Sequence, residues 1–553
     1  MDFECFFPEC ILYEDEHLLV VNKPCGINTH APSPYATNGI YDYLRNLAPR
    51  WSNLAIVHRL DKETSGVLLF SKTALANREL TKQFTERRVS KKYILITAGS
   101  PPQEHFTVIS HIMKQGSQFK SVPFKPGLDR AETNFRIPSN QDFEILNLCK
   151  DWVDYARTLH RKLDLKVLIA EPLTGRTHQV RLHASGRGCP VLGDALYGGV
   201  ESARVWLHSV ELKFRHPQDG RELIFRAPPA TSHPAISLRS AILNSNTNIY
   251  RLIHAVADKL PQIFIDRFGD WLLVQTEREL LNDEIEFVKN LADECGARGV
   301  YHKFLKKEIR SLQPAVVSPK LIFGKPAPEH FTAIENGVNY ELSFSEGYSV
   351  GLFIDQRDNR RRILSNYIAK AFPLLEKPTS PQALNLFSYT CGFSVCAAKI
   401  GIHTVSVDLS AKYLEWGKRN FQLNQLDPSP HEFCKGDVFD WLKRFKKKGR
   451  KFDLIILDPP TFSQSRLSGA FQAWKDYPKL LKSCLCLLKN GGRLFASLNT
   501  AGVSPEKFIE MFCETVSAEN RKIVKYYYAT QPVDFPSCAE QPAYLKTLWA
   551  QIE

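Results

Sequence analysis

The amino-acid sequence lacks several features that define common classes of protein. None of its 13 cysteines belongs to a C-x-x-C pair, so their spacing predicts neither a zinc site nor a dithiol redox centre. An odd number of scattered thiols is typical of a reducing compartment. Near the N-terminus no basic segment precedes an apolar stretch, and the apolar runs elsewhere are short. We therefore expect a cytoplasmic protein that neither spans a membrane nor holds a metal.

Repeats and compositional bias are missing as well. We find no internal repeat, low-complexity tract or heptad pattern, and the 43% share of hydrophobic residues is ordinary for a globular protein. A chain of 553 residues exceeds what one hydrophobic core usually organises. The usual size of about 100–200 residues per domain predicts about three domains.

Basic residues outnumber acidic ones. Lys and Arg total 72 against 59 for Asp and Glu, which gives a net charge of +13. This surplus favours a polyanionic partner, because each phosphate that a basic side chain neutralises releases condensed counterions. Many basic proteins bind no nucleic acid, so charge alone leaves the partner open.

Four successive segments differ in their pattern. Residues 1–230 mix short β-rich runs with a few helical stretches, which predicts an α+β domain built on a sheet. Residues 231–248 are rich in Pro, Ser, Ala and Asn, and we interpret them as a linker. Residues 249–335 predict a small α/β domain with an RNA-binding or accessory role. Residues 336–553 alternate apolar strands with amphipathic helices, which predicts a Rossmann-like, doubly wound parallel sheet.

The most specific stretch of the first segment is HRLDKETSGVLLFSK (His58–Lys72). It places the carboxylate of Asp61 in a turn beside Arg59. Together with GRTHQVRLH (Gly175–His183) and GDALYG (Gly193–Gly198), this stretch resembles the motifs of RluA-type pseudouridine synthases. The resemblance implies a mixed, largely antiparallel sheet and the isomerisation of uridine in RNA without a cofactor.

The same resemblance implies a role for each of four side chains. Asp61 would start cleavage of the glycosidic bond, either by adding covalently or by taking a proton from the sugar, and the sequence leaves both routes open. Arg181 would keep that carboxylate ionised. Tyr93 would stack on the base and handle a proton at carbon 5, and Arg59 would fill the gap left by a flipped uridine. Taken singly, such residues more often cap turns or pack in cores, so the matched set carries the hypothesis.

The last segment carries a second set of motifs. NLFSYTCGFSVCAAKIG (Asn385–Gly401) predicts a strand, a loop and a helix, and it is followed by Asp408, by GDVF from Gly436, and by LDPPTF (Leu457–Phe462). In a doubly wound sheet these positions fall at the carboxyl ends of strands, where ligands bind. An acidic residue after the second strand suits a ribose diol. The loop is not a G-x-G-x-x-G fingerprint, which disfavours NAD.

This arrangement resembles class I S-adenosylmethionine-dependent methyltransferases, and more closely the RlmI/RlmK-type enzymes that act on ribosomal RNA. The resemblance implies S-adenosyl-L-methionine as the cofactor and Asp458 as a catalytic residue. Pro459, Pro460 and Phe462 would lie beside the target base, since a rigid loop with a stacking ring can hold a flipped base. The implied cofactor-binding residues are Asn385, Phe387, Ser388, Thr390, Gly392, Asp408, Asp437 and Asp458.

The methyl acceptor depends on whether a cysteine must attack the base. SYTCGFSV and DPPTFSQS resemble the branch of that family that forms 7-methylguanosine, whereas GLFIDQRDNR and YLK resemble the branch that forms 5-methylcytosine. Methylation at cytosine carbon 5 requires a thiolate to add to the ring. LDPPTF contains no cysteine, and Cys538 in DFPSCAE is only a weak candidate. We therefore favour a guanine ring nitrogen over cytosine carbon 5.

Two basic stretches are hypotheses for RNA contact. A run of positive charge at Lys443–Lys451 is more often a solvated helix end. A second group lies close to the predicted cleft and would form a phosphate-binding face. It consists of Arg357, Arg360, Arg361 and Arg362.

These patterns together favour a bifunctional enzyme that isomerises uridine to pseudouridine and methylates a base in RNA, with 23S ribosomal RNA as the favoured substrate. Transfer RNA is an alternative substrate. A further alternative is an RNA-binding ribosome-assembly factor with one inactive half, although intact Asp61, Tyr93 and Arg181 argue against decay of the first half. The sequence does not indicate an oligomeric state.

Overall fold

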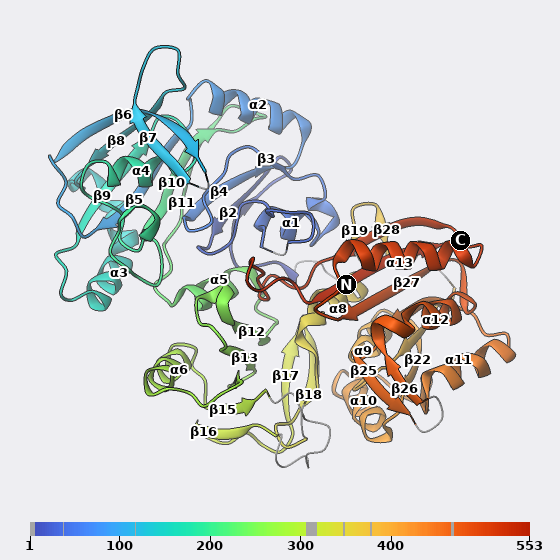
Figure 1. Cartoon of the computed structure of the whole chain (residues 1–553). Coiled ribbons are helices and arrows are strands. Elements are labelled where there is room, and N and C mark those ends of the chain that lie inside the picture. The colour runs from blue at the N-terminus through green and yellow to red at the C-terminus, as the bar shows by residue number, and fades with distance from the viewer. Residues whose placement is uncertain are drawn as a thin grey trace.

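Figure 1 shows the computed structural model of the chain, in which a central region joins an N-terminal and a C-terminal domain. The structure describes residues 6–36, 38–116, 118–305, 318–346, 349–376, 379–465 and 469–553. The predicted multidomain fold is confirmed, with an α+β domain first and a Rossmann-like domain last. No helix within the described ranges is both long and apolar enough to cross a bilayer.

An 11-stranded sheet forms the N-terminal domain. Its strands are β1 (Ile11–Glu14), β2 (Leu18–Lys23), β3 (Ala55–Ile56), β4 (Ser65–Ser71), β5 (Ser90–Thr97), β6 (His105–Gln115), β7 (Gln118–Pro123), β8 (Ala131–Arg136), β9 (Lys166–Pro172), β10 (Leu207–Arg215) and β11 (Glu222–Arg226). Their order is β1-β2-β4-β10-β5-β9-β8-β6-β7, with β3 beside β4 and β11 beside β10. Among the described pairs only β4 and β10 run parallel, so the sheet is mixed and largely antiparallel, as predicted.

Helices cover both faces of the β2–β4 pair, which explains why these strands are apolar throughout. The helices of this domain are α1 (Ile40–Arg45), α2 (Ala74–Thr85), α3 (Phe143–Leu159) and α4 (Gln179–Ser185). Successive side chains of a strand point to opposite faces. Val20 therefore packs in one cluster with Leu80 of α2, whereas Leu19 packs in another with Leu44 of α1.

Residues 231–248, which we expected to be a linker, form part of a core. They contain α5 (Pro234–Ile242), where Ala235, Leu238 and Ile242 are buried. These side chains join a cluster that also holds Leu44 of the N-terminal domain. Pro234 does not interrupt the helix, because it occupies the first turn, where a missing N–H costs little. The segment is thus a packed junction.

The central region contains a five-stranded sheet in the order β12-β13-β14-β15-β16. Its elements are β12 (Ile249–His254), β13 (Phe264–Phe268), β14 (Trp271–Thr276), α6 (Asn282–Glu294), β15 (Gly299–Phe304) and β16 (Lys320–Gly324). The expected strands QIFIDRF and WLLVQTE and the helix after them correspond to β13, β14 and α6. The boundary predicted between residues 335 and 336 falls in the turn of a hairpin formed by β17 (Phe331–Glu335) and β18 (Val338–Leu342). The domain boundaries themselves stay predictions.

The C-terminal domain is built on a seven-stranded sheet in the order β23-β22-β21-β24-β27-β29-β28. Its strands are β21 (Gln382–Leu386), β22 (His403–Asp408), β23 (Glu432–Lys435), β24 (Phe452–Leu457), β27 (Leu488–Asn499), β28 (Ile523–Ala529) and β29 (Leu545–Ile552). The first five strands of that order are parallel, and β29 is antiparallel to both of its neighbours. The predicted strands ALNLFSY, TVSVDLS, FDLIILDPP and GGRLFASLN correspond to β21, β22, β24 and β27.

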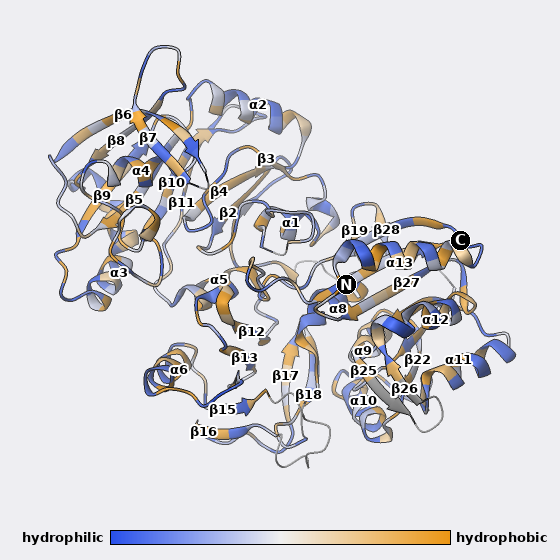
Figure 2. Ribbon diagram, viewed as in Figure 1, coloured by the Kyte–Doolittle hydropathy of each residue, from blue (hydrophilic) through white to orange (hydrophobic). Residues whose placement is uncertain are grey.

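Helices and two short strand pairs surround this sheet. They are α8 (Arg357–Leu364), β19 (Tyr367–Ala369), β20 (Phe372–Pro373), α9 (Gly392–Lys399), α10 (Ala411–Leu423), α11 (Val438–Lys447), β25 (Phe462–Ser465), β26 (Gly469–Gln472), α12 (Ala473–Leu485) and α13 (Pro505–Ala518). Figure 2 shows hydrophilic residues along much of α11. Lys443, Lys446 and Lys447 are exposed there, as expected for a solvated helix end.

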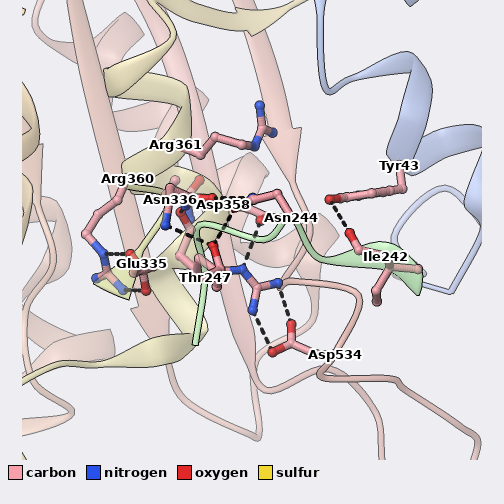
Figure 3. Close-up of polar contacts among 12 residues, drawn as sticks. Tyr43, Ile242, Asn244, Thr247, Glu335, Asn336, Asp358, Arg360, Arg361 and Asp534 are labelled. Carbon is pink, nitrogen blue, oxygen red and sulfur yellow. Dashed lines mark hydrogen bonds and ion pairs between the residues drawn. The ribbon is translucent and has the colours of Figure 1, made fainter. Parts of the chain in front are cut away.

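The arginines of α8 do not form an exposed face, so the hypothesis of a phosphate-binding surface is wrong. All four are buried, namely Arg357, Arg360, Arg361 and Arg362. Arg357 donates two hydrogen bonds of 2.7 and 2.6 Å to Asp534, and Arg360 donates two of 2.6 and 2.7 Å to Glu335 (Figure 3). The reason is that α8 lies between the domains, where its charges hold neighbouring segments.

Contacts across this junction fix the N-terminal domain against the rest of the chain. Arg361 points away from the other pairs in Figure 3 and donates to the carbonyl of Leu47 at 3.1 Å. Tyr43 of α1 donates to the carbonyl of Ile242 at 2.9 Å. The N-terminal domain is therefore connected to α5 and α8 by specific polar contacts.

Candidate active sites

The first candidate site is a turn of the N-terminal domain that carries Asp61. The N–H of Thr64 donates to the carbonyl of Asp61 at 3.1 Å, which closes the turn. The side chain of Asp61 is 24% exposed and so remains accessible. Arg181 of α4 lies on its inner side, with Nη1 at 3.8 Å from Oδ2 of Asp61. The predicted carboxylate and guanidinium are thus brought together from positions 120 residues apart.

Arg181 has a closer partner that the sequence reasoning missed. Its Nε and Nη2 donate to the two carboxylate oxygens of Asp194 at 2.7 and 2.6 Å. Burial disfavours the charge of Arg181, but the hydrogen bonds that it donates to Asp194 raise its pKa overall. A bidentate pair of this kind fixes the plane of the guanidinium. Asp194 lies in the GDALYG motif, so the motif was recognised in the sequence but this residue was given no role.

Tyr93 lies on β5 next to this pair. Its partners in the sheet are Ala170 on β9 and Ser209 on β10. Burial raises the pKa of its hydroxyl, and the negative charge of Asp61 adds to that effect, so the phenol stays protonated at neutral pH. Arg59, by contrast, is exposed at the outer side of the turn. Tyr93 is thus a protonated group on the inner side of the turn, whereas Arg59 projects on its outer side.

Lys23 stabilises the turn through hydrogen bonds to backbone carbonyls, and the sequence reasoning did not single it out. It is fully buried and donates to the carbonyls of Pro24 at 2.9 Å, Ile27 at 2.8 Å and Lys62 at 3.3 Å. Burial lowers the pKa of its ammonium to about 8. The ammonium thereby connects the segment after β2 to the residue that follows Asp61.

The nearby histidines act as structural hydrogen-bonding groups. His58 stacks on Phe84 and accepts from the N–H of Leu69, and burial lowers its pKa to about 3. His183 bonds to Ser110 and Thr133, each through a hydroxyl. Burial lowers the pKa of His183 to about 4, so both rings are neutral at physiological pH.

The second candidate site is a cavity of about 330 Å³ at the carboxyl ends of the parallel strands of the C-terminal sheet. Ten of the eleven positions predicted for cofactor or base line it, namely Asn385, Phe387, Ser388, Thr390, Gly392, Asp408, Asp437, Asp458, Pro459 and Pro460. The remaining one, Phe462, begins β25 and is not one of the lining residues. A cavity of this size is in the usual range for a bound cofactor.

The loop between β21 and α9 has an unusual backbone. Phe387, Tyr389 and Cys391 all have a positive φ, at 58°, 48° and 62°. Such conformations cost about 1–3 kcal/mol each in a residue other than Gly and occur mainly at ligand sites. Asp408 holds the loop, because its carboxylate accepts from the N–H of Tyr389 at 2.9 Å. The chain therefore strains this loop to shape one wall of the cavity.

Gly392 lets this wall approach its neighbour closely. A Cβ on Gly392 would lie 3.0 Å from Cδ1 of Leu352, which is too close for ordinary contact. Thr390 fixes the same segment by donating to the carbonyl of Gly351 at 2.6 Å. The close approach explains why residue 392 is a glycine, and the hydrogen bond to Gly351 explains why residue 390 carries a hydroxyl.

The two acidic residues at strand ends cap local backbone and also face the cavity. Asp437 accepts from the N–H of Phe439 at 2.9 Å and of Asp440 at 3.2 Å, and so caps α11. Burial raises the pKa of Asp408. Val438 and Phe439 add apolar surface to the same cavity. Carboxylates beside apolar side chains suit the ribose and adenine of S-adenosylmethionine, so the residues present fit that cofactor.

Asp458 lies at the other side of the cavity, at the end of β24. Gln356 donates to it through Nε2 at 3.0 Å and also donates to Ser497 at 2.9 Å. Burial raises the pKa of Asp458 to about 6. Asp355, which sequence reasoning missed, lines the cavity beside Gln356 and accepts from the hydroxyl of Tyr544 at 3.0 Å. The GLFIDQRDNR motif contains both new residues, so a sequence signal existed for them.

No cysteine is among the residues that line this cavity in the described part of the chain. Cys391 is fully buried under the loop, and burial raises the pKa of its thiol to about 12. Its Sγ lies 2.5 Å from the position that a Cβ on Gly417 would take, so Cys391 packs against α10. Cys538 lies in the loop before β29, where its backbone pairs with Gln541.

Comparisons with known proteins define the class of each half. The model of the RNA pseudouridylate synthase family matches residues 17–186, and that of the S-adenosylmethionine-dependent methyltransferase family matches residues 296–550. The structure of SMU.776 complexed with SAH, described as a methyltransferase, is 26% identical with a TM-score of 0.50 and covers 63% of this chain and 89% of that one. The protein is therefore a pseudouridine synthase joined to an S-adenosylmethionine-dependent RNA methyltransferase.

Two curated relatives identify the methyltransferase family more narrowly. Ribosomal RNA large subunit methyltransferase I of Shigella dysenteriae is 31% identical over 313 residues, which is 54% of this chain and 72% of that protein. The protein of the same name from Yersinia pseudotuberculosis is 32% identical over 305 residues, which is 54% of this chain and 73% of that one. The chain belongs to this methyltransferase family and carries a pseudouridine synthase domain in addition. It is a bifunctional RNA-modifying enzyme.

Proposed function

We propose that the enzyme isomerises a uridine and methylates nitrogen 7 of a guanine, both in ribosomal RNA of the large subunit. The observation that carries the choice of acceptor is the absence of cysteine from the residues that line the C-terminal cavity in the described ranges. Cytosine carbon 5 becomes nucleophilic only after a thiolate has added to the ring. Nitrogen 7 of guanine already has a lone pair and carries no proton, so neither a nucleophile nor a base is needed.

In the N-terminal site, we assign the glycosidic cleavage to Asp61. Arg181 orients the carboxylate of Asp61 and is itself paired with Asp194, so Asp61 keeps more of its reactivity than it would in a direct bidentate pair. Tyr93 supplies a ring for the base and a protonated hydroxyl near carbon 5. Arg59, exposed beside the turn, fills the gap in the RNA stack.

In the C-terminal site, S-adenosylmethionine supplies the methyl group. Asp408 would accept hydrogen bonds from the ribose hydroxyls, the loop from Asn385 to Gly392 would enclose the cofactor, and Asp437 would bind it on the adenine side. Asp458, Pro459 and Pro460 hold the target base, and we assign the stacking ring to Phe462, at the start of β25. Methyl transfer makes the guanine ring cationic, and a buried carboxylate nearby stabilises that charge.

The assignment to ribosomal RNA rests on the names of the relatives and on the net charge of +13. In the first alternative, the enzyme has both activities but acts on transfer RNA. An assembly factor with one inactive half would show only one of the two products.

Mass spectrometry of nucleosides from a strain that lacks the protein tests all three outcomes. We expect ribosomal RNA of the large subunit to lose one pseudouridine and one 7-methylguanosine. Complementation with Asp61→Asn should restore only the methyl group, and complementation with Asp408→Asn should restore only the pseudouridine. Loss of 5-methylcytosine instead of 7-methylguanosine would refute the proposed acceptor, and losses confined to transfer RNA would refute the proposed substrate.

A further inference from the structure

The two later motifs of the N-terminal domain contact each other twice beside Asp61. In one contact, Arg181 of GRTHQVRLH donates to Asp194 of GDALYG. In the other, Nδ1 of His178 lies 2.7 Å from the hydroxyl of Tyr197. The ring of Tyr197 also packs against Arg181, with its centroid 5.2 Å from Cζ of the guanidinium. His178 and Tyr197 are therefore part of the same unit as the ion pair that faces Asp61.

The imidazole of His178 is held in a fixed position by an uncommon backbone conformation and by two rings. His178 directly precedes α4 with φ 56° and ψ 19°, which is the left-handed region. A residue with a side chain adopts this region uncommonly, and strained positions of this kind cluster at active sites. The ring of Phe119 on β7 lies 5.5 Å from the imidazole, and that of Tyr197 lies 5.6 Å from it, both measured between centroids.

The contacts of His178 indicate which ring nitrogen carries the proton. Burial lowers the pKa of His178, so its ring is neutral at neutral pH and has a single N–H. Burial raises the pKa of Tyr197, and the backbone N–H of Phe119 donates to its hydroxyl oxygen. The phenol proton is then donated to Nδ1 of His178, and we assign the ring proton to Nε2. Among the described residues, no hydrogen bond is found at Nε2.

His178 lies close to the carboxylate that starts the reaction. The negative charge of Asp61 opposes the effect of burial on the pKa of His178, and the positive charge of Arg181 adds to it. Such effects are strong only when the groups are about 4–6 Å apart. The imidazole is half-buried, so part of it stays accessible. His178 thus offers a neutral, oriented N–H donor at the place where a uridine meets Asp61.

We propose that Nε2–H of His178 donates a hydrogen bond to O2 of the target uracil and stabilises the base as it leaves the ribose. This proposal deepens the function proposed for the N-terminal site, because it rests on cleavage started by Asp61. Both routes open to Asp61 break the bond between C1′ and N1 and leave its electron pair on the base. Negative charge then develops on N1, O2 and O4. A fixed donor to such a charge binds more tightly in the transition state than in the ground state.

The rotation of the base lets one donor serve both halves of the reaction. Uracil turns about the axis through N3 and C6 before C5 bonds to C1′, and this turn exchanges O2 and O4. His178 therefore contacts O2 in the substrate and O4 in the product. C5 then loses its proton and N1 gains one, so the base ends neutral. Arg181 is not available for this role, because Asp194 binds two of its nitrogens and Asp61 lies at the third.

Three replacements of His178 separate the donor from the backbone conformation. Gln carries an amide N–H at about the distance of Nε2, whereas the amide of Asn reaches only as far as Nδ1. Asn tolerates the left-handed region better than Gln or Ala. We expect single-turnover isomerisation to fall about 100-fold in His178→Ala and His178→Asn, and about 10-fold in His178→Gln, because only Gln restores a donor.

Two further variants test the orientation of the ring and the specificity of the effect. Tyr197→Phe keeps the ring beside Arg181 but no longer fixes the proton of His178 on Nε2, so isomerisation should fall about 10-fold. His160→Ala is the matched control and should behave like the wild type. His160 is also half-buried, and its Nε2 lies 3.0 Å from the hydroxyl of Ser202 at the end of α3.

Replacement of single oxygens in the RNA locates the contact. The target position is first mapped in ribosomal RNA and then prepared in a fragment as uridine, 2-thiouridine and 4-thiouridine, since sulfur accepts hydrogen bonds more weakly than oxygen. Comparing each RNA with the wild type and with His178→Ala cancels the intrinsic effect of sulfur on the leaving base. The 2-thio substitution should slow the wild type about tenfold more than His178→Ala. For 4-thiouridine this difference should stay below about threefold, because O4 reaches His178 only after rotation.

Methyl transfer by the same chains reports that each variant is folded, and filter binding reports its affinity for the fragment. An isomerisation rate in His178→Ala within about threefold of wild type would overturn the proposal. Equal rates for His178→Gln and His178→Asn, or equal effects of 2-thiouridine on the wild type and on His178→Ala, would also overturn it. So would a loss of RNA affinity that accounts for the whole effect, since His178 would then bind the backbone of the RNA.

Failure of the proposed function gives a different result. A normal isomerisation rate in Asp61→Asn would refute the role of Asp61 in cleavage. The comparison of uridine with 2-thiouridine would still decide whether His178 contacts O2.

Discussion

The role of Asp194 leads to a prediction that can be worked out from the structure. The side chains of Arg181 and Asp194 are only 5% and 1% exposed, and two short hydrogen bonds join them. Asp194→Asn keeps the shape of the side chain but removes its charge. Breaking a buried pair by removing one partner typically costs about 3–5 kcal/mol, because the remaining charge is left without a partner.

Asp61 should recover part of that loss. It lies 3.8 Å from Nη1 of Arg181, and a charge at that distance is worth about 4 kcal/mol at an effective dielectric constant of 20. Because Asp61 is 24% exposed, solvent screens much of this attraction, and we expect a net loss of about 2–3 kcal/mol in local stability. The recovery has a catalytic cost, since Asp61 would be drawn into the direct pair that Asp194 now occupies. Isomerisation should fall about 100-fold or more.

Hydrogen exchange followed by mass spectrometry measures the local stability, because one free energy of unfolding is not defined for a chain of several domains. Tritium release from 5-tritiated uridine in RNA measures the isomerisation. Methyl transfer by the same chain should stay within about twofold of wild type, since Asp194 is far from that cavity in sequence and fold. Asp154→Asn, an exposed acid paired with Arg157, is the matched control.

A double variant separates charge from shape. If Arg181 is the reason for the loss, Asp194→Asn combined with Arg181→Gln should be more stable than Asp194→Asn alone, because no buried charge remains unpaired. Unchanged protection of α4 together with an isomerisation rate within about threefold of wild type would refute the reasoning.

Further predictions concern both sites. Asp61→Asn should abolish pseudouridine formation while methylation continues, as measured by nucleoside analysis; an isomerisation rate near that of the wild type would remove Asp61 from its role. Because burial raises the pKa of Asp458 to about 6, its anionic form is lost when the pH falls through about 6, and kcat/KM for methyl transfer should drop there with a slope of about one per pH unit. A profile that is flat down to pH 5 would show that the charge of Asp458 is not used. Cys538→Ser should leave methyl transfer from labelled cofactor within about twofold of wild type, whereas Cys391→Ala should weaken cofactor binding through packing alone; complete loss of transfer in Cys538→Ser with intact binding would point to a thiolate mechanism.

Several elements were predictable because local chemistry decides them. The inner strands of the C-terminal sheet are largely buried on both faces, as strands covered by helices on both sides must be, and β21, β22, β24 and β27 were found from that pattern. The motifs around Asp61 and in the loop after Asn385 combine residues whose spacing is set by one turn or one strand end. Such motifs consist of a few consecutive residues, so they can be recognised without any knowledge of the tertiary fold.

Other features were misinterpreted because burial cannot be deduced from polarity alone. The arginines of α8 have the composition of an RNA-binding face, yet each is buried and two are neutralised by Asp534 and Glu335, which lie 177 and 25 residues away. Residues 231–248 have the composition of a linker, yet α5 packs into a core. In both cases distant segments supply the partners, and no local pattern reports them.

The sequence by itself determined the two families, the reaction classes and ten of the positions that line the C-terminal cavity, because these depend on short motifs. Only the tertiary structure decided which groups act together. It showed that Arg181 is shared between Asp194 and Asp61, and that Asp355 stands beside the segment that follows β24. The physical reason is that an ion pair or a shared cavity depends on distances of a few ångströms between residues far apart in the chain, and those distances are set by how the sheets and helices pack.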